Sequence, residues 1–387
     1  MPLAFAHAGL AMGFVNTIIV GIICTHSIEI LVKSAHMIYQ RNRIPAIGFA
    51  DLAEASFQMG PKLFHRYAQT AKFLINFFLV TDLIGCCAVY VVLVAKNLKQ
   101  VVDIRTETDY DTRIYMVVLL IPLILINLIK NLKYLSPCSM IANVLMVTGL
   151  GITFYFLCQD IPPLDERPQF IEVQQWPLFF GTVIFAMEGI GVVMPLENNM
   201  LNPSHFIGCP GILNIGMTIL ITLYSVTGFL GYLKYGNKTE SVITLNLDKH
   251  DPLAQSVKLM IAIGIFFTYT IQFYVPMGVI WHYVKTKFSK NLNIAEYALR
   301  ISLVTFTVLL AIVVPNLGGF ISLIGAVTIS MLGLVFPALI ETATIYENPG
   351  FGKFNWRLIK NIFIIFFGFL GFFSGTYVSL KEIFESY

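Results

Sequence analysis

Charged side chains are scarce in this sequence. Asp, Glu, Lys and Arg make up only 12% of the 387 residues, whereas hydrophobic residues make up 57%. The mean hydropathy is +0.76. A soluble domain carries about a quarter charged residues, so this chain has too little polar surface to face water on all sides. The scarcity of charge argues against a soluble enzyme or binding module and predicts a membrane protein.

Several sequence motifs are also missing. There is no basic cluster of the kind that binds nucleic acid, and no Lys or Arg precedes the first apolar stretch as in a cleavable signal peptide. No HExxH, Gly-x-Ser-x-Gly or phosphate-loop pattern occurs, so we expect no enzyme activity and no cofactor. We also expect no metal, because no metal-ligand spacing is found among the cysteines, which are Cys24, Cys86, Cys87, Cys138, Cys158 and Cys209.

The sequence does contain a series of apolar runs. Each is long enough to cross a hydrocarbon core of about 30 Å at about 1.5 Å per residue. The short apolar piece Pro2–Gly9 precedes them, and tight polar turns join neighbouring runs. We predict an all-α polytopic membrane bundle in which residues 1–387 form one transmembrane domain. The predicted spans are Leu10–Val32, Phe73–Ala95, Ile114–Ile129, Met140–Leu157, Leu178–Leu196, Ile212–Leu233, Leu259–Val284, Ala295–Val314, Leu317–Ile340 and Ile359–Tyr377.

The charge that is present differs between the two sides of these spans. One side carries most of the lysines and arginines, including those of segments 33–72, 285–300 and 353–360. The other side carries the acidic segments 103–111 and 160–172. Positive charge stays on the cytoplasmic side of membranes, so the first side is predicted to be cytoplasmic and the C-terminus extracellular or luminal. The sequon Asn237-Lys238-Thr239 falls on the outer side, which predicts glycosylation of Asn237.

A carboxylate lies halfway through one predicted span. Glu188 stands between Phe185 and two glycines, Gly189 and Gly191, and Pro195 follows. A charged group at this depth costs about 2.5–3.5 kcal/mol, and glycine and proline are poor helix formers. Irregular backbone in a membrane persists where it lines a cavity, so we interpret this stretch as a broken helix that faces substrate. The alternative is a glycine-rich helix packed closely on a neighbour, with Glu188 paired to a polar residue.

Asp82 is the second carboxylate within a predicted span. Burial can raise the proton affinity of such a group enough for it to carry a proton, so Asp82 and Glu188 are the candidates for proton coupling. The alternative for Asp82 is a structural hydrogen bond to Thr81 or to an asparagine on an adjacent helix.

A third polar stretch lies in the span Leu259–Val284. Its candidate substrate contacts are Thr268, Tyr269, Gln272 and Tyr274. Thr268 and Gln272 are four residues apart and therefore share one helix face. Such a face can line a transport cavity, or it can serve hydrogen bonding between helices, which stabilises by about 0.6 kcal/mol on average.

The start of the chain repeats a fragment of the broken segment. Met1-Pro2-Leu3 matches Met194-Pro195-Leu196, which follows the predicted break. Many transporters consist of two inverted repeats whose binding sites are formed by discontinuous helices. We therefore expect Pro2–Gly9 to be the remnant of a truncated first helix whose own glycine break lies upstream of Met1.

Taken in order, several blocks make the sequence similar to the proton-coupled amino acid transporters of the amino acid/auxin permease family over nearly its whole length. The blocks are Asn97–Val102, Pro177–Thr182, Pro195–Asn198, Ser256–Leu259, Gln272–Pro276, Ile321–Gly325 and Gly375–Tyr377. The resemblance implies a fold like that of leucine transporters, with five-plus-five inverted repeats and an eleventh helix. It also implies proton-driven transport of small neutral amino acids such as glycine, alanine and proline.

The resemblance also implies a place for the substrate and for the protein. Substrate would lie between the 185–191 break, the helix of Tyr90 and the 268–274 face, with Ser322 of a matching block beside it. The membrane would be the plasma membrane or the lysosomal or vacuolar membrane. The chain departs from the family in one respect. The outer loops of the family share a disulfide, but the outer segments Asp103–Arg113 and Lys234–Pro252 of this chain contain no cysteine. Two alternatives stay open: a sensor or scaffold that binds amino acid without moving it, and a truncated form that transports poorly.

Overall fold

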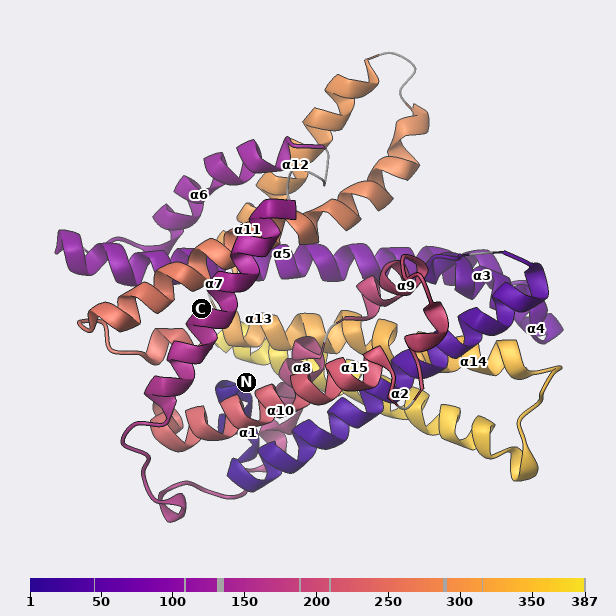
Figure 1. The fold of residues 1–387 in the computed structure, drawn as a ribbon, viewed down its shortest axis with the longest axis horizontal. Coiled ribbons are helices and arrows are strands. Elements are labelled where there is room, and N and C mark those ends of the chain that lie inside the picture. The colour runs from indigo at the N-terminus through magenta and orange to yellow at the C-terminus, as the bar shows by residue number, and fades with distance from the viewer. Residues whose placement is uncertain are drawn as a thin grey trace.

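A computed structural model describes residues 1–44, 46–107, 109–130, 136–187, 189–208, 210–287, 291–314 and 316–385. These residues form helices joined by loops, and no strand occurs among them (Figure 1). The predicted all-α class is therefore confirmed for the described part of the chain.

The helices run through almost the whole described chain. The α-helices are α1 Pro2–Ala8, α2 Leu10–Asn42, α3 Phe49–Met59, α4 Lys62–His65, α5 Ala68–Thr106, α6 Thr112–Asn127, α7 Ser136–Leu157, α8 Trp176–Ala186, α9 Ile190–Asn198, α10 Ile212–Tyr235, α11 Pro252–Val284, α12 Leu292–Val313, α13 Leu317–Ile324, α14 Phe336–Ile345 and α15 Trp356–Glu385. A π-helix, η8 Gly325–Val335, joins α13 to α14. Short 3-10 turns are η2 Leu164–Glu166, η3 Val173–Gln175, η4 Pro203–His205, η5 Gly236–Lys238, η6 Ile243–Asn246, η7 Lys285–Lys287 and η9 Lys353–Asn355.

The apolar runs of the sequence correspond to helices. Within the described residues, 9 helical stretches are long and apolar enough to cross a membrane, and the shorter apolar helix α6 lies between two of them. The predicted polytopic membrane bundle is therefore confirmed. Helix α2 has 33 residues and α5 has 39, both longer than predicted from their apolar runs. Hydropathy detects only the part of a helix that matches the membrane, whereas polar residues with good helix propensity continue the helix beyond it.

Polar side chains begin several of these helices. Asp111 accepts a hydrogen bond from the backbone N–H of Arg113 at the start of α6, and Asp251 accepts one from Leu253 at the start of α11. Asn316 does the same for Gly319 at the start of α13. These are N-caps that bind the free N–H groups of a first helical turn. They fix where the outer loops end and the helices begin.

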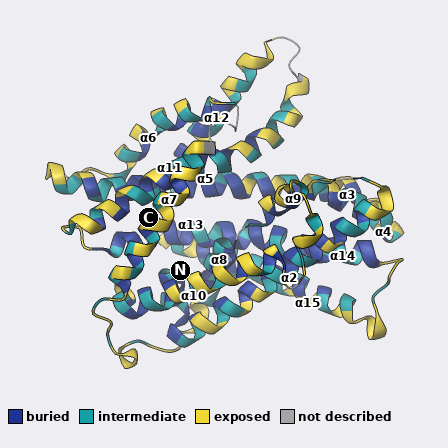
Figure 2. Ribbon diagram, viewed as in Figure 1, coloured by how far each residue is buried: buried dark blue, intermediate teal, exposed yellow. Residues whose placement is uncertain are grey.

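The core of the bundle is formed by a few central spans. In the most apolar window of Leu317–Ile345, 78% of the residues are buried, and α5 reaches 61%. The corresponding share is only 17% in Ile212–Lys238 and 22% in α15's span, Lys353–Glu385. Figure 2 shows this division, with buried residues in the middle of the bundle and exposed residues on the outer helices. The apolar side chains on those outer helices are the ones that contact lipid.

The short helix α1 is packed inside the bundle against α2, α8 and α10. Its residues Ala4, Phe5 and Ala8 are fully buried. Gly9 follows with a φ of 92°, a left-handed conformation that favours glycine. A side-chain carbon at Gly9 would also lie 2.6 Å from the carbonyl oxygen of Gln169. The backbone at Gly9 therefore packs tightly against the segment that precedes α8, between the end of α1 and the start of α2.

Candidate functional site

The apolar stretch Val173–Asn198 contains two helices instead of one. Helix α8 ends at Ala186 and α9 begins at Ile190, at the place where the glycine pattern predicts an interruption. Glu188 lies outside the described residues, so the predicted role of its carboxylate is not addressed by the structure. Pro195 lies inside α9 and has no N–H to give to the carbonyl of Gly191. The break therefore places N–H groups at the start of α9 and carbonyl groups near it where a polar ligand can bind them.

A cavity of about 520 Å³ reaches this break. Gly191, Pro195 and Asn198 of α9 line it, on one face of the helix because they are spaced by four and three residues. Leu79 of α5 lies opposite, and a side-chain carbon at Gly191 would come within 2.9 Å of it. The remaining lining residues are Gly48, Phe49, Ala50, Asp51, Lys72, Asn76, Val275, Gly278, Val279, His282 and Tyr283.

The polar residues of this cavity mark which side it opens on. The ammonium of Lys72 is 2.7 Å from a carboxylate oxygen of Asp51 and 2.8 Å from one of Glu54. Asn76 donates a hydrogen bond of 3.0 Å to the hydroxyl of Tyr283. These groups belong to α3, the start of α5 and the end of α11, on the side that the charge pattern predicts to be cytoplasmic. The cavity therefore connects the break with that side.

The predicted aromatic residues lie elsewhere. Tyr90 and Tyr269 line one apolar niche, whose other residues are Val91, Val94, Leu119, Leu123 and Phe266. Tyr269 is 1% exposed, and its hydroxyl lies 2.7 Å from the hydroxyl of Thr307. Neither tyrosine lines the 520 Å³ cavity. The structure brings these two predicted residues together but not to the cavity beside α9.

Two other predicted residues on α11 serve local contacts or lie at the surface. The Thr268 hydroxyl donates to the carbonyl of Gly264 in the same helix at 2.9 Å. Tyr274 is 40% exposed. Gln272, which lies between Thr268 and Tyr274 in the sequence, is half-buried. The hydrogen bond of Thr268 stays within its own helix, so it is not the bond between helices that was the alternative to a role in the cavity.

Ser322 and Phe185 lie where α8 contacts α13 and η8. Ser322 donates to the carbonyl of Leu178 at 3.3 Å and accepts from Ser379 of α15 at 2.9 Å. Phe185 is half-buried and packs against both main apolar clusters of the core. Gly189 stands in the interruption, with open space where a side chain would be. Of the predicted substrate contacts in the described residues, the cavity therefore holds Gly191, while Ser322 joins helices.

Asp82 is 2% exposed and is joined to the π-helix. The hydroxyl of Thr328 in η8 donates to its carboxylate at 2.5 Å. The neighbour Thr81 instead donates to the carbonyl of Phe77. Thr328 is a partner that the sequence did not indicate, because η8, distant in sequence, packs directly on α5. A π-helix is frequent at functional sites, so Asp82 stays a candidate for proton coupling.

Sequence reasoning missed another buried carboxylate. Glu197 in α9 is 0% exposed, and its oxygens lie 2.7 Å from Nε2 of His36 and 3.1 Å from the hydroxyl of Tyr39. His36 and Tyr39 both belong to α2. The only signal in the sequence was a charged residue directly after Met194–Leu196 in an apolar stretch, and its partners are more than 150 residues away.

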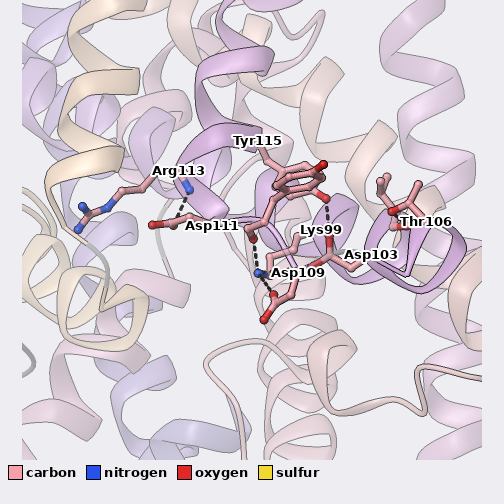
Figure 3. Close-up of polar contacts among 9 residues, drawn as sticks. Lys99, Asp103, Thr106, Asp109, Asp111, Arg113 and Tyr115 are labelled. Atoms are coloured by element: carbon pink, nitrogen blue, oxygen red, sulfur yellow. Dashed lines mark hydrogen bonds and ion pairs between the residues drawn. The ribbon is translucent and has the colours of Figure 1, made fainter.

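On the predicted outer side, charged side chains join the end of α5 to the loop that leads to α6. Lys99 contacts a carboxylate oxygen of Asp109 at 2.6 Å and also donates to the carbonyl of Tyr110. Tyr115 donates to Asp103 at 2.5 Å (Figure 3). The ammonium of Lys99 stabilises the charged form of Asp109 and lowers the pKa of that carboxyl below its usual value. These contacts hold the outer ends of the two helices together.

Comparison with known proteins adds a family to this geometry. The family model described as transmembrane amino acid transporter protein matches residues 1–381. The chain is similar to the proton-coupled amino acid transporter-like protein pathetic of Drosophila melanogaster, with 46% identity over 390 residues that cover 100% of this chain and 82% of the relative. It is also similar to the amino acid transporter AVT3C of Arabidopsis thaliana, with 28% identity over 404 residues that cover 100% of this chain and 87% of the relative.

Proposed function

The chain belongs to the transmembrane amino acid transporter family, and on that premise we propose that it carries small neutral amino acids of the glycine, alanine and proline class together with protons. It is a multi-pass membrane transporter rather than an enzyme. The Drosophila relative is described as proton-coupled transporter-like, which supports the proton as the coupling ion. The proposed membrane is the plasma membrane or the lysosomal or vacuolar membrane.

One observation carries the proposal: the interruption between α8 and α9 lies beside a cavity of about 520 Å³. An amino acid has one anionic and one cationic end. The N–H groups at the start of α9 suit the carboxylate, and carbonyl groups near the break suit the ammonium. A site of this kind binds the backbone portion common to all amino acids.

The small residues near the break support a small substrate. Gly191 lines the cavity, and a side chain there would already contact Leu79 of α5. An amino acid with little side chain fits beside such a wall better than a long or charged one. Phe49, Val275 and Val279 add apolar surface to the same cavity, which disfavours a charged side chain.

Reconstituted protein can test this proposal. The 387-residue chain in liposomes with an inward proton gradient is expected to accumulate labelled glycine, alanine and proline, and the uptake is expected to carry positive charge inward. Leucine, glutamate and lysine compete poorly if the substrate class is right. Uptake that ignores the proton gradient contradicts proton coupling, and binding of alanine without any flux identifies a sensor instead.

A further inference from the structure

We propose that Glu197 and His36 form the pair that carries the coupled proton, an inference that rests on the proposed function above. Glu197 belongs to α9, the half of the broken helix that lines the cavity, and His36 belongs to α2. Nε2 of His36 lies 2.7 Å from Oε1 of Glu197, and the glutamate is 0% exposed. The pair therefore combines a buried acid with an imidazole, whose two ring nitrogens can hold one proton or two.

The charge of the pair makes it sensitive to one proton. With the proton bound, imidazolium and carboxylate together carry no net charge, which a buried site tolerates when the two are hydrogen-bonded. Without it, a neutral imidazole faces a buried carboxylate, and the pair carries one negative charge that burial disfavours. Tyr39 assists by donating to Glu197 at 3.1 Å or to Asn198 at 2.9 Å, although its single proton can serve only one of them at a time.

A second cavity gives the proton a way out. His36 is 25% exposed in its side chain and lines a cavity of about 530 Å³ between α2, α14 and α15. The proton that departs is the one on Nδ1 of the imidazolium, because Nε2 remains bonded to Glu197. The Nδ1–H bond breaks with its electron pair left on Nδ1, and the proton forms an O–H bond with water in this cavity. The cavity lies on the side predicted to be cytoplasmic, which is where a symported proton must be released.

Charged groups lie around the pair on α2, α14 and α15 and, on the other side of α9, on α3, α5 and α11. The cavity that His36 lines has three cations against one carboxylate, and two of the cations are already paired, Lys33 with Glu29 at 2.7 Å and Lys360 with Glu341 at 2.8 Å. Such an excess of positive charge does not retain a released proton. The titratable groups facing the pair through this cavity are His26, Lys33, Glu341, Arg357 and Lys360, and those facing α9 through the 520 Å³ cavity are Asp51, Lys72, His282 and Tyr283.

Release of the proton is coupled to movement of α9. This helix packs against α2, and Glu197 contacts α2 on one side while Gly191 and Pro195 face the substrate cavity on the other; Asn198 reaches both. A deprotonated pair is relieved when water reaches Glu197, which requires α9 to separate from α2. The same movement changes the wall of the substrate cavity. Proton release and amino acid release are therefore linked through one short helix.

The test separates exchange from proton coupling. Wild-type chain and the variants Glu197→Gln and His36→Gln are reconstituted in liposomes that hold a pH-sensitive dye. Counterflow of labelled alanine measures movement that needs no net proton transfer, and the dye measures protons that accompany added alanine. In both variants counterflow is expected to stay near the wild-type rate, while alanine-driven proton entry falls by about tenfold or more, within the usual range for coupling between two ligands.

Two further variants make the result specific. Glu385→Gln removes an exposed carboxylate at the outer end of α15 that pairs with Lys381 and lines neither cavity, so it is expected to behave as wild type in both measurements. Asp82→Asn tests the other buried carboxylate as a rival carrier. The assignment is overturned if Glu197→Gln shows proton entry at the wild-type rate, or if proton entry is lost in Asp82→Asn and in no other variant. If Glu197→Gln does not elute as folded protein, His36→Gln decides. If wild type itself moves alanine without protons, the proposed function fails instead.

Discussion

At the scale of single residues, buried carboxylates in this chain differ in what binds them. Asp82 accepts from the neutral hydroxyl of Thr328, whereas Glu197 faces an imidazole that can itself hold a proton. A hydroxyl does not change its charge with pH, but an imidazole does. Glu197 therefore has a neighbour that can itself take up or release a proton.

Asp109 offers a test of electrostatics outside the membrane. Lys99 donates to its carboxylate, so the pKa of Asp109 is lowered and the contact is expected to persist until the pH falls below the ordinary aspartate value of about 3.9. Because the folded pKa is the lower one, the stabilisation is present above the unfolded value and is lost as pH falls through the folded value. In Lys99→Met the Asp109 carboxyl is expected to titrate close to about 3.9.

The measurement is the carbon-13 shift of the labelled Asp109 carboxyl during a pH titration of protein in nanodiscs, with the signal assigned by Asp109→Asn. Lys238→Met is the matched control, since this outer-side cation makes no ion pair with a described residue. Its titration should overlay that of wild type. Identical titration curves for wild type and Lys99→Met would contradict an effect of the Lys99 contact on the pKa of Asp109.

At the scale of elements, the close approach of α8 to η8 depends on two glycines. A side-chain carbon at Gly325 would lie 2.0 Å from the carbonyl oxygen of Gly181, and one at Gly181 would lie 2.4 Å from the hydroxyl of Ser322. Backbone therefore packs directly on backbone, as is common between membrane helices. This contact fixes the helix that ends at the break against the π-helix that binds Asp82.

Gly325→Ala is expected to destabilise the protein, because α8 and η8 must separate to admit the methyl group. Overpacking of this kind costs about 1–3 kcal/mol, and a clash with backbone lies at the upper end. The measurement is the midpoint temperature at which detergent-solubilised protein loses its monodisperse peak. Gly216→Ala in α10 is the control, since nothing lies within 4 Å of that added carbon.

The two substitutions are expected to shift the midpoint in opposite directions. Alanine is a better helix former than glycine by about 1 kcal/mol, so Gly216→Ala should leave the midpoint unchanged or raise it. A midpoint for Gly325→Ala equal to that of Gly216→Ala would show that α8 and η8 do not approach as closely as described.

At the scale of the whole molecule, both large cavities described here lie on the same side of the bundle. The 520 Å³ cavity opens near α3 and the start of α5, and the 530 Å³ cavity opens near the start of α15. In Figure 1, α3 and α4 lie at the right end of the bundle, whereas both marked termini lie in its left half. Both of these cavities therefore open toward the predicted cytoplasm, whereas Lys99 and Asp109 join α5 to the loop before α6 on the opposite side.

The orientation of the molecule can be checked at Asn237. This residue is exposed in η5 on the predicted outer side. In a eukaryotic host, the wild-type chain is expected to carry a glycan that slows its migration on a gel. Treatment with a glycan-removing amidase should increase the mobility of the wild-type chain, whereas Asn237→Gln should show no such shift. Asn246→Gln, in the same outer loop but outside any sequon, should still be glycosylated. An unglycosylated wild type would contradict the placement of this loop outside.

The fold was largely predictable from the sequence, whereas the site was so only in part. Apolar runs predicted the spans, and the glycines around residue 189 predicted the interruption between α8 and α9 and a cavity beside it. The prediction grouped Tyr90 and Tyr269 with that cavity, yet the structure places them in a separate niche. Helix periodicity gives the face on which a residue lies, but it does not give the helix that covers that face.

What the sequence alone determined was the all-α membrane class and where along the chain the apolar helices lie, because crossing a membrane depends on local hydropathy and helix length. What only the tertiary structure decided was which polar groups meet. Glu197 and His36 are 161 residues apart, and Asp82 and Thr328 are 246 apart. Such pairs arise from how helices pack, and their chemistry depends on a partner's identity that no local pattern contains. The proposed proton pair on α2 and α9 therefore came into view only when the two helices were placed side by side.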